Sequence, residues 1–359
     1  MGVYIHKPRS WPVFHWNQEK LLTLLTGVRH RQGKLAGRME AAGPSQRQTV
    51  LLLNLVLDTT GSAGTDGVIF NPGEVRSSAA RRLGLEITGQ IHTSPQIERT
   101  VEMMLDPALH YDKPLSADRI SGWHTAWSAT GQEPVRKVSA RDWRGHGKRT
   151  SPVHYETADT GFVKAEMEKF LQWFNKEMGI DPVVKAAIAH RWFLSIHPFD
   201  EGNGRIARAI ADMQLSRSDG SAYRCYSMSA QICRERNLYH TIVEGTMKAM
   251  PDITVWLEWF LACLDRALAA TDEALAGVMR RLRFRERHET ASFNERQLLM
   301  IERLLDGSAN RLATSKWAEM TCCSPDTALR DIQDLVDRGI LLKDRSGGRS
   351  TAYLLKDLV

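Results

Sequence analysis

The order of apolar and polar positions along the chain predicts a protein built mainly from amphipathic helices. Apolar residues recur at helical spacing over residues 182–196 and again over residues 206–215. The first run ends at the step His197-Pro198, and because proline disfavours helical backbone in the residue before it, we expect His197 to lie on a loop. Residues 201–204, with the sequence EGNG, favour a tight turn that opens onto the second helix.

The same spacing predicts helices along most of the remaining chain. On the amino-terminal side we expect them over residues 21–35, 50–58, 72–83, 95–105, 117–128 and 162–178. On the carboxyl-terminal side, one helix follows Ser227, a tryptophan-rich helix covers residues 255–270, and a charged helix covers residues 279–289. Residues 59–67 (TTGSAGTDG) are small and polar, so they predict a turn after the helix at 50–58.

Two segments depart from the helical pattern. Residues 133–156 alternate around a glycine-rich centre, which predicts a β-hairpin. Residues 291–359 predict three helices, the third over 324–338, and then a second hairpin, an order that resembles a winged helix-turn-helix. Its expected DNA contacts are Thr327, Arg330, Arg345 and Arg349. Four aspartates on the third helix would repel phosphate, so contact with another protein is an equally open alternative.

Composition narrows the class of protein without deciding its function. The chain has 359 residues, 42% hydrophobic and 25% charged, which suits a globular protein of two or three domains. It has no apolar run long enough for a membrane span and no signal-peptide pattern, so we predict a cytoplasmic protein without a membrane partner. The five cysteines contain no C-x-x-C pair and indicate reduced thiols. The net charge of +6 is compatible with binding of nucleic acid or ATP.

Residues 197–208 combine the groups that a phosphate site needs. A glycine-rich turn at the start of a helix presents unpaired N–H groups and the positive end of the helix dipole. Arg205 and Arg208 are three residues apart, so they lie on one helix face and can bind further phosphate oxygens. Glu201 offers a hard oxygen ligand for Mg²⁺, and His197 has a pKa suited to proton removal at neutral pH. Taken singly, each of these residues also has an ordinary structural explanation.

Taken together, the residues fit the pattern H-x-F-x-[D/E]-G-N-G-R-x-x-R without a gap or mismatch, and this stretch resembles the active-site motif of the Fic family of nucleotidyl transferases. The resemblance implies that His197 is the general base and Glu201 the Mg²⁺ ligand. It assigns nucleotide phosphates to Gly202, Asn203, Gly204, Arg205 and Arg208, with Asn203 on the α-phosphate and Arg208 on the γ-phosphate. Phe199 is expected to anchor the loop in the core.

The activity implied by the resemblance is transfer of AMP from Mg-ATP to a Tyr, Thr or Ser hydroxyl of a protein target, the enzyme itself included, with release of pyrophosphate. Another nucleotide such as UTP stays open, because base specificity lies outside the motif. A further alternative is a DNA-binding transcriptional regulator whose Fic core senses nucleotide. In the family, an R-x-x-Y-Y pattern places an aromatic side chain near adenine, and Tyr239 matches its first tyrosine while His240 replaces the second.

One branch of the family also carries an inhibitory helix with the pattern [S/T]-x-x-x-E-[G/N], whose glutamate pairs with the second motif arginine. Here Ser62, Asp66 and Gly67 occupy the corresponding positions. Aspartate is shorter than glutamate by about 1.5 Å, and each glycine inside a helix costs about 1 kcal/mol of helix propensity. We therefore expect inhibition that is weaker than in those relatives, or lost, with a flexible linker as the alternative.

These observations predict a mostly α-helical fold with four parts. An N-terminal helical region covers residues 1–92, and its inhibitory segment is 59–67. A Fic catalytic domain with a small β-hairpin flap covers 93–278, a charged connecting helix 279–290, and a winged helix-turn-helix 291–359. The expected partners are ATP, an unidentified protein target and DNA, and the sequence leaves a homodimer open.

Overall fold

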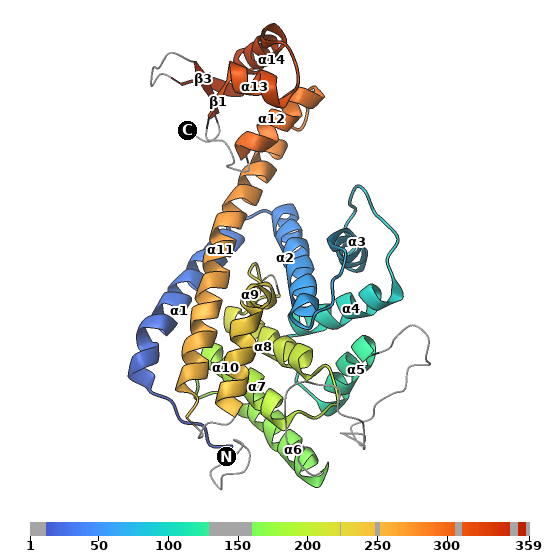
Figure 1. The fold of residues 1–359 in the computed structure, drawn as a ribbon, viewed down its shortest axis with the longest axis vertical. Helices are drawn as coiled ribbons and strands as arrows, with labels where there is room; N and C mark the ends of the chain where they lie inside the picture. The colour runs from blue at the N-terminus through green and yellow to red at the C-terminus, as the bar shows by residue number, and fades with distance from the viewer. Residues whose placement is uncertain are drawn as a thin grey trace. The chain divides into compact units, whose positions relative to one another are not determined.

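The computed structural model describes residues 12–128, 160–222, 224–247, 252–305, 311–344 and 351–356. The chain divides into two compact units, Met1–Thr271 and Asp272–Val359 (Figure 1). The predicted hairpin at 133–156 and the predicted DNA contacts Arg345 and Arg349 lie outside the described residues. None of the helices in the described parts of the chain is long and apolar enough to cross a membrane.

Apart from an isolated bridge between His15 and Asp252, the regular elements in the described residues of the first unit are helices, as the pattern of apolar positions predicts. Its helices are α1 (Gln18–Glu40), α2 (Pro44–Thr65), α3 (Pro72–Arg82), α4 (Pro95–Leu109), α5 (Ala117–Ser128), α6 (Thr160–Lys176), α7 (Pro182–Ile196), α8 (Asn203–Asp219), α9 (Met228–Arg234), α10 (Arg236–Met247) and α11 (Thr254–Arg287). Helix α11 continues from this unit into the second one. The charged segment predicted as a helix at 279–289 is helical up to Arg287, and it continues the predicted tryptophan-rich helix without a break.

Local capping signals fix where several of these helices begin. Asp181 caps α7, because its side chain accepts hydrogen bonds from the backbone N–H groups of Val183 (2.8 Å) and Val184 (3.3 Å), and Pro182 follows as the first helical residue. Asn71 caps α3 in the same way, and Ser227 caps α9. These short-range features explain why the sequence predicts the start of each of these helices correctly.

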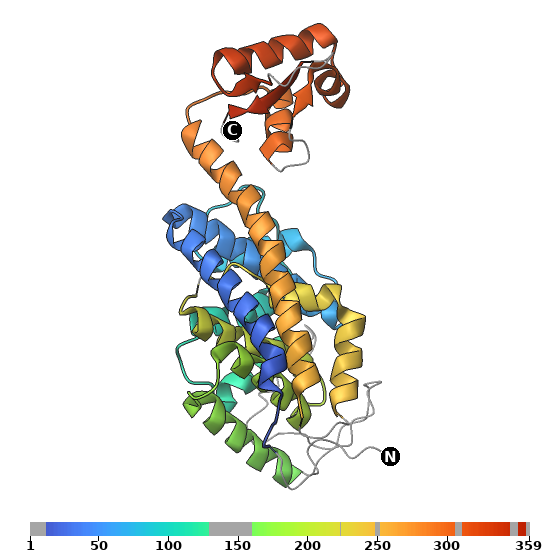
Figure 2. The same cartoon turned by 90° about the vertical axis from the view of Figure 1, so that its left-hand side faces the viewer.

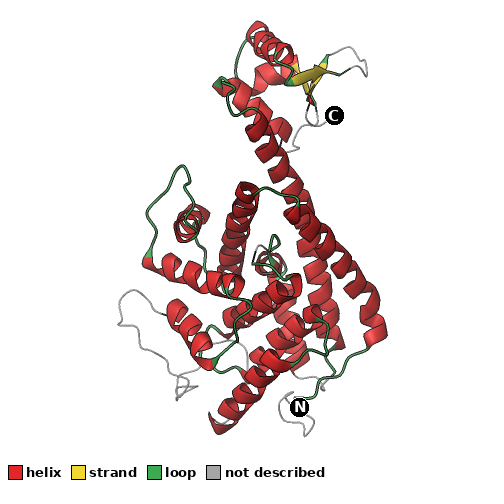
Figure 3. Ribbon diagram, turned by 180° about the vertical axis from the view of Figure 1, so that it is seen from behind, coloured by secondary structure: helices red, strands yellow, loops and turns green. Residues whose placement is uncertain are grey.

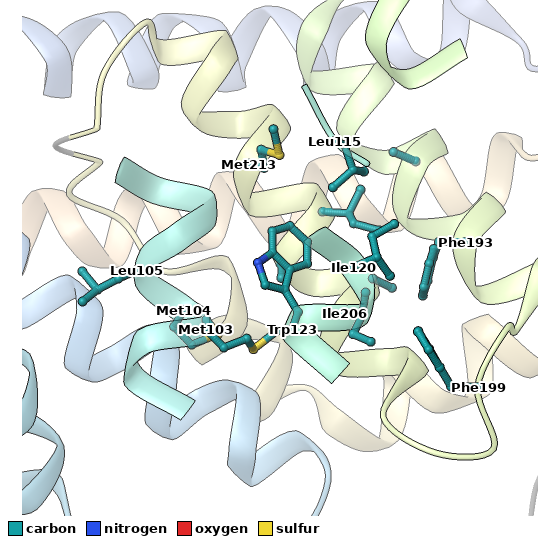
Figure 4. Packing of buried hydrophobic residues seen from close by; sticks show 14 of the residues in the cluster. Met103, Met104, Leu105, Leu115, Ile120, Trp123, Phe193, Phe199, Ile206 and Met213 are labelled. Atoms are coloured by element: carbon teal, nitrogen blue, oxygen red, sulfur yellow. The ribbon is translucent and has the colours of Figure 1, made fainter. Parts of the chain in front are cut away.

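Helices α7 and α8 form the centre of the first unit and carry the motif on the loop between them. Every residue of α7 from Val183 to Ile196 is buried, which is the pattern of a helix surrounded by others. Phe199 projects from the motif loop into the cluster that contains Phe193 and Ile206, and it is only 3% exposed (Figure 4). The expectation that Phe199 anchors the loop in the core is confirmed.

Helix α2 runs on to Thr65, so the predicted turn from residue 59 was wrong. The reason is close packing of α2 against α9 (Figure 1). A Cβ added at Gly61 would lie 2.6 Å from the Cα of Ala230, and one at Gly64 would lie 2.8 Å from the Cys233 sulfur. The glycines weaken the isolated helix but allow this close approach, which the sequence pattern could not show.

The substitution Gly61→Ala should destabilise the protein by about 1–3 kcal/mol, since the new methyl group would collide with the α9 backbone. Gly27→Ala is the matched control, because Gly27 lies inside α1 with nothing within 4 Å of its Cβ position. That control should leave stability unchanged or raise it by up to about 1 kcal/mol through helix propensity. Denaturant unfolding of both variants checks this, and equal stabilities would contradict the packing argument.

The N-terminal helix is tied to the rest of the first unit by polar contacts. Arg31 of α1 forms an ion pair of 2.7 Å with Asp265 of α11, which runs beside it (Figure 2). Arg29 donates to the α7 cap residue Asp181 (2.8 Å) and to Ser218 of α8 (2.6 Å). Helix α1 therefore supports the amino end of α7 and the carboxyl end of α8.

The second unit contains α12 (Glu295–Leu305), α13 (Thr314–Met320), α14 (Pro325–Asp337) and the only strands in the described parts of the chain (Figure 3). These are β1 (Leu312–Ala313), β2 (Leu341–Lys343) and β3 (Ala352–Leu355), which form an antiparallel sheet in the order β1-β3-β2. Its helices and the β2–β3 pairing match the prediction, whereas the two-residue strand β1 was missed. The assignment to the winged helix-turn-helix class stays a prediction.

Candidate functional site

His197 ends helix α7 in a strained backbone conformation. Its φ is 51°, in the left-handed region, while its N–H still donates to Phe193 O (3.0 Å). For a residue other than glycine this conformation costs roughly 1–2 kcal/mol. The imidazole is half-buried at the start of the loop. A strained histidine that the loop nevertheless retains is typical of a functional side chain.

Asn203 holds the motif loop closed from the first position of α8. Its side-chain carbonyl accepts from Phe199 N (3.0 Å), and its side-chain amide donates to Phe199 O (2.7 Å). The same amide nitrogen lies 3.3 Å from the ring nitrogens of His197. The resemblance assigns Asn203 to a phosphate, whereas in this structure its side chain is engaged with the loop and faces His197.

The turn before α8 has the geometry of an anion site. Gly202 is the N-cap residue with a φ of 79°, which glycine adopts without strain. The first N–H with an acceptor inside the helix is that of Ile206, which donates to Gly202 O (3.1 Å). The N–H groups of Asn203, Gly204 and Arg205 precede it, so they belong to the part of a helix that can bind an anion.

Arg205 and Arg208 bring two buried positive charges to the same helix end. Arg205 is 1% exposed and lies over the Trp127 ring, 4.6 Å from its centroid. Arg208 is 2% exposed. Among the described residues, Nη1 of Arg205, Nη1 of Arg208 and Trp127 Nε1 are buried without a hydrogen-bond partner, and Arg205 Nη2 has only its ion pair with Asp66. A bound polyphosphate would accept hydrogen bonds from these unsatisfied donors.

Asp66 places a carboxylate directly on these arginines. Asp66 is the C-cap of α2. Its carboxylate oxygens lie 3.0 Å from Arg205 Nη2 and 2.9 Å from Arg208 Nη2. One of these oxygens is 3.8 Å from the position that a Cβ added at Gly204 would take. Burial alone would raise the pKa of Asp66, but the guanidinium groups of Arg208 and Arg205 outweigh it and lower that pKa. The carboxylate is therefore charged at neutral pH and occupies the anion site.

The other two residues of the inhibitory pattern support this contact. Ser62 Oγ accepts from Arg208 Nε (3.0 Å), and Ser62 O accepts from Arg208 Nη2 (2.9 Å). Gly67 has a φ of 83°, so the chain turns away immediately after Asp66 through a conformation that favours glycine. The structure thus brings Ser62 and Asp66 to the motif arginines, with Gly67 in the turn that follows, and the helix extends far enough for the shorter aspartate to reach both.

A buried charge network fixes α2 in this position. Arg224 forms ion pairs with Asp212 of α8 (2.7 Å) and with Asp58 of α2 (3.1 Å). Asp58 also accepts hydrogen bonds from Ser227 (2.6 Å) and Asn54 (3.0 Å). Sequence reasoning missed this network, because its members come from three separate segments. It holds the helix that carries Asp66 against the helix that carries the arginines.

Glu201 lies on the exposed part of the motif loop, next to exposed Asp200. Magnesium in nucleotide sites binds one or two carboxylates and completes its shell with phosphates and water. A single exposed carboxylate beside an anion site fits that chemistry. No group of three or more ligating side chains was found in the described residues.

Two aromatic side chains of α5, Trp127 and His124, adjoin the motif and were not predicted as site residues. A Cβ at Gly202 would lie 2.9 Å from the Trp127 ring, so glycine is required there. His124 stacks on Phe199 with centroids 4.0 Å apart, and burial lowers the pKa of His124. Their helical spacing indicates core packing, and nothing in the sequence alone distinguishes that from a wall of the site.

Tyr239 is not on the surface of the site. It is 3% exposed, and its hydroxyl lies 3.1 Å from His190 Nε2. Its ring packs against Trp259, with centroids 5.5 Å apart. The assignment of Tyr239 to nucleotide binding stays a prediction.

In the second unit, Thr327 and Arg330 lie on α14 as predicted. Thr327 is half-buried and its N–H is capped by Ser324 Oγ (3.2 Å), whereas Arg330 is exposed. Asp331 is buried and paired with Arg296 (2.7 Å), and Asp334 accepts from Gln297 and Arg338. Asp337 accepts from Gln333 (2.7 Å), so three of the four aspartates on this helix have internal partners. Contact with DNA or protein stays a prediction.

Comparison with known proteins agrees with the geometry of the motif. Residues 114–215 match the Fic/DOC family, and residues 4–85 match a domain of unknown function, DUF4172. The chain is 34% identical to protein adenylyltransferase fic-1 of Caenorhabditis elegans over 88 residues. These residues make up 24% of this chain and 16% of that protein. The chain is 30% identical to protein adenylyltransferase Fic of Drosophila yakuba over 104 residues. These residues make up 28% of this chain and 19% of that protein. The chain thus spans less than a fifth of the length of these two curated relatives.

Solved structures extend the likeness to most of the chain. A Fic family protein from Desulfovibrio desulfuricans is similar over 96% of this chain and 98% of its own, with a TM-score of 0.56 and 15% identity. A Fic domain containing signaling protein from Bacteroides thetaiotaomicron covers 70% of this chain and 98% of its own, with a TM-score of 0.51 and 19% identity. At these identities the likeness shows the fold.

Proposed function

Because this chain carries a Fic/DOC family domain, we propose that it is a protein adenylyltransferase that transfers AMP from Mg-ATP to a Tyr, Thr or Ser hydroxyl of a protein target, itself included. One observation carries the proposal. The structure already holds an anion, the Asp66 carboxylate, between Arg205 and Arg208 at the amino end of α8. A site that binds a carboxylate in this way has the donors and the charge that bind a polyphosphate.

In this mechanism His197 accepts the proton of the target hydroxyl. The freed oxygen attacks the α-phosphorus of ATP, the bond from that phosphorus to the bridging oxygen breaks, and pyrophosphate leaves. Asn203 keeps the loop, and with it the imidazole, in a fixed position through its two hydrogen bonds to Phe199. Positioning and electrostatic stabilisation supply most of the catalysis in phosphoryl-type transfer, and proton transfer adds to them.

The remaining motif residues bind charge that develops on the phosphates. The N–H groups at the start of α8, with Arg205 and Arg208, face the leaving pyrophosphate. Glu201 would hold Mg²⁺, which would neutralise phosphate oxygens when bound. Ser62 Oγ can keep its contact with Arg208 Nε after Asp66 is displaced, because Asp66 pairs with Nη2 of that guanidinium.

The proposal also assigns an inhibitory role to Asp66. A phosphate group and the Asp66 carboxylate cannot occupy the same place between the arginines, so ATP must displace Asp66 to bind productively. The ion pairs that Asp66 makes in the nucleotide-free protein therefore oppose nucleotide binding.

The test incubates the Asp66→Gly protein with Mg²⁺ and ATP labelled at either the α- or the γ-phosphate. Label retained on protein from the α position alone is expected for AMP transfer. Label from the γ position would indicate a kinase reaction and contradict the proposal. A parallel incubation with α-labelled UTP checks the base, and transfer from UTP without transfer from ATP would replace AMP by UMP.

A further inference from the structure

Trp127 contacts two parts of the anion site at once. The guanidinium carbon of Arg205 lies over the indole ring, 4.6 Å from its centroid. A Cβ added at Gly202 would lie 2.9 Å from the same ring, so the indole also packs against the turn before α8. Trp127 itself belongs to α5, a separate helix. The indole therefore joins α5 to the first arginine of the motif and to the glycine that precedes α8.

The hydrogen bonds of Arg205 all depend on Asp66 within the described part of the chain. Arg205 Nε donates to Asp66 Oδ2 (3.1 Å), and Arg205 Nη2 forms an ion pair with the same oxygen (3.0 Å). The remaining nitrogen, Nη1, is buried without a hydrogen-bond partner. Arg208 differs, because its Nε also donates to Ser62 Oγ (3.0 Å). Only one of the two arginines thus has a second polar partner among the described residues.

Displacement of Asp66 by a nucleotide would therefore affect the two arginines differently. Arg208 can keep Ser62, whereas the indole face is the support that remains for Arg205 among the described side chains. Arg205 is 1% exposed, and the attraction between a cation and an aromatic face is stronger where water is excluded. Contact with the ring face uses none of the guanidinium N–H groups, so all of them stay available to phosphate oxygens.

We propose, building on the adenylyl transfer above, that Trp127 is a positioning residue that holds Arg205 against the nucleotide phosphates once Asp66 has left. A carboxylate would be an unsuitable support for this arginine, because it would compete with phosphate for the same N–H groups, as Asp66 does. An aromatic face stabilises the positive charge without that competition. Trp127 thus acts on the nucleotide through Arg205.

Calorimetric titration of ATP into the Asp66→Gly protein tests this proposal with two substitutions. Trp127→Leu removes the aromatic face and should weaken ATP binding by about tenfold. Trp127→Phe keeps an aromatic face but loses the indole N–H, and it should weaken ATP binding by no more than about threefold. Equal weakening in both variants would assign the effect to the N–H or to packing at Gly202, and would overturn the proposal. Unchanged affinity in Trp127→Leu would also overturn it.

Trp173→Leu is the matched control for lost packing. Trp173 is half-buried like Trp127, and a cation, Lys185, lies over its ring at 5.6 Å from the centroid, outside the motif. In the Asp66→Gly protein, this substitution should lower the thermal unfolding midpoint and leave ATP affinity unchanged. A loss of affinity as large as that in Trp127→Leu would mean that lost tryptophan packing weakens binding in general, and the positioning role would be overturned.

A readout without nucleotide keeps this proposal distinct from the proposed function. Thermal unfolding midpoints of Trp127→Leu, Arg205→Met and the double variant, each in the Asp66→Gly protein, form a mutant cycle. If the ring supports Arg205, the shift caused by Trp127→Leu should become smaller in the Arg205→Met background. An undiminished shift would overturn the proposal. If the Asp66→Gly protein binds no ATP, the proposed function fails, while a coupled cycle would still establish that Trp127 supports Arg205.

Discussion

The His197→Ala protein should transfer AMP roughly 100- to 10,000-fold more slowly than the parent while binding ATP with nearly the same affinity. The reason is that the proposed mechanism assigns proton transfer to His197, whereas it assigns phosphate binding to Arg205 and Arg208, which already pair with the Asp66 carboxylate. Rates of label transfer from α-labelled ATP, together with calorimetric titration of ATP, check both halves of this expectation. Retained transfer would remove His197 from the role of base.

A second substitution at the same position separates chemistry from folding. Because His197 has a φ of 51°, glycine fits its backbone better than histidine does. His197→Gly should therefore be at least as stable as the parent in thermal unfolding and still lose transfer. His30→Ala is the matched control, since His30 is exposed on α1 and should change neither property. A strongly destabilised His197→Gly protein would indicate that the imidazole serves structure.

The elements around the motif could be predicted from the sequence because their signals are local. Pro182 and Asp181 start α7, the step His197-Pro198 follows its end, and Gly202 precedes α8. Each of these signals acts within a few residues, through backbone geometry or a capping hydrogen bond. The predicted bounds of α7 accordingly agree with the structure.

Features that depend on distant segments could not be predicted in the same way. Gly61 suggested a break in α2, but the approach of Ala230 from α9 makes glycine the residue that fits there. Trp127 lies over Gly202 and Arg205, although its spacing within α5 indicates only a buried helix face. These contacts are set by tertiary packing, which overrides local propensity.

The resemblance to the Fic family indicated which positions belong to the site. The structure shows which groups the side chains at these positions contact. It placed Asn203 and Tyr239 at the nucleotide, whereas both contact protein groups in this structure. Asn203 holds the loop beside His197, and Tyr239 lies next to His190. A motif identifies which residues gather at a site, but the hydrogen bonds decide which of them is available to a ligand.

The Asp66→Gly protein should bind ATP at least about tenfold more tightly and modify itself faster than the parent. The physical reason is that Asp66 pairs with two arginines that are each at most 2% exposed, and ATP must displace it. The Asp66 side chain is itself 26% exposed, so water screens part of the interaction, but its removal leaves two buried guanidinium groups without a carboxylate partner. The nucleotide-free variant should therefore unfold at a lower temperature, and saturating Mg-ATP should raise that temperature more than it does in the parent.

Two further substitutions at position 66 identify the property that inhibits. Asp66→Asn keeps the size and loses the charge, so it should resemble Asp66→Gly if charge is decisive. Asp66→Glu restores the family's residue, and it should inhibit at least as strongly as the parent if its longer side chain still reaches both arginines. Equal ATP affinity in the parent and all three variants would show that the contact between Asp66 and the arginines does not compete with nucleotide.

Acidification should not relieve this inhibition in the parent protein. Arg208 and Arg205 lower the pKa of Asp66 below its usual value of 3.8, so the carboxylate stays charged at pH 5 and above. A group with a lowered pKa contributes stability above its unfolded pKa and loses it only as the pH falls through the folded value. The ratio of Asp66→Gly to parent ATP affinity should therefore stay constant between about pH 5 and 8. A ratio that falls toward one at pH 5 would mean that Asp66 is protonated there and that the ion pairs are weaker than their geometry indicates.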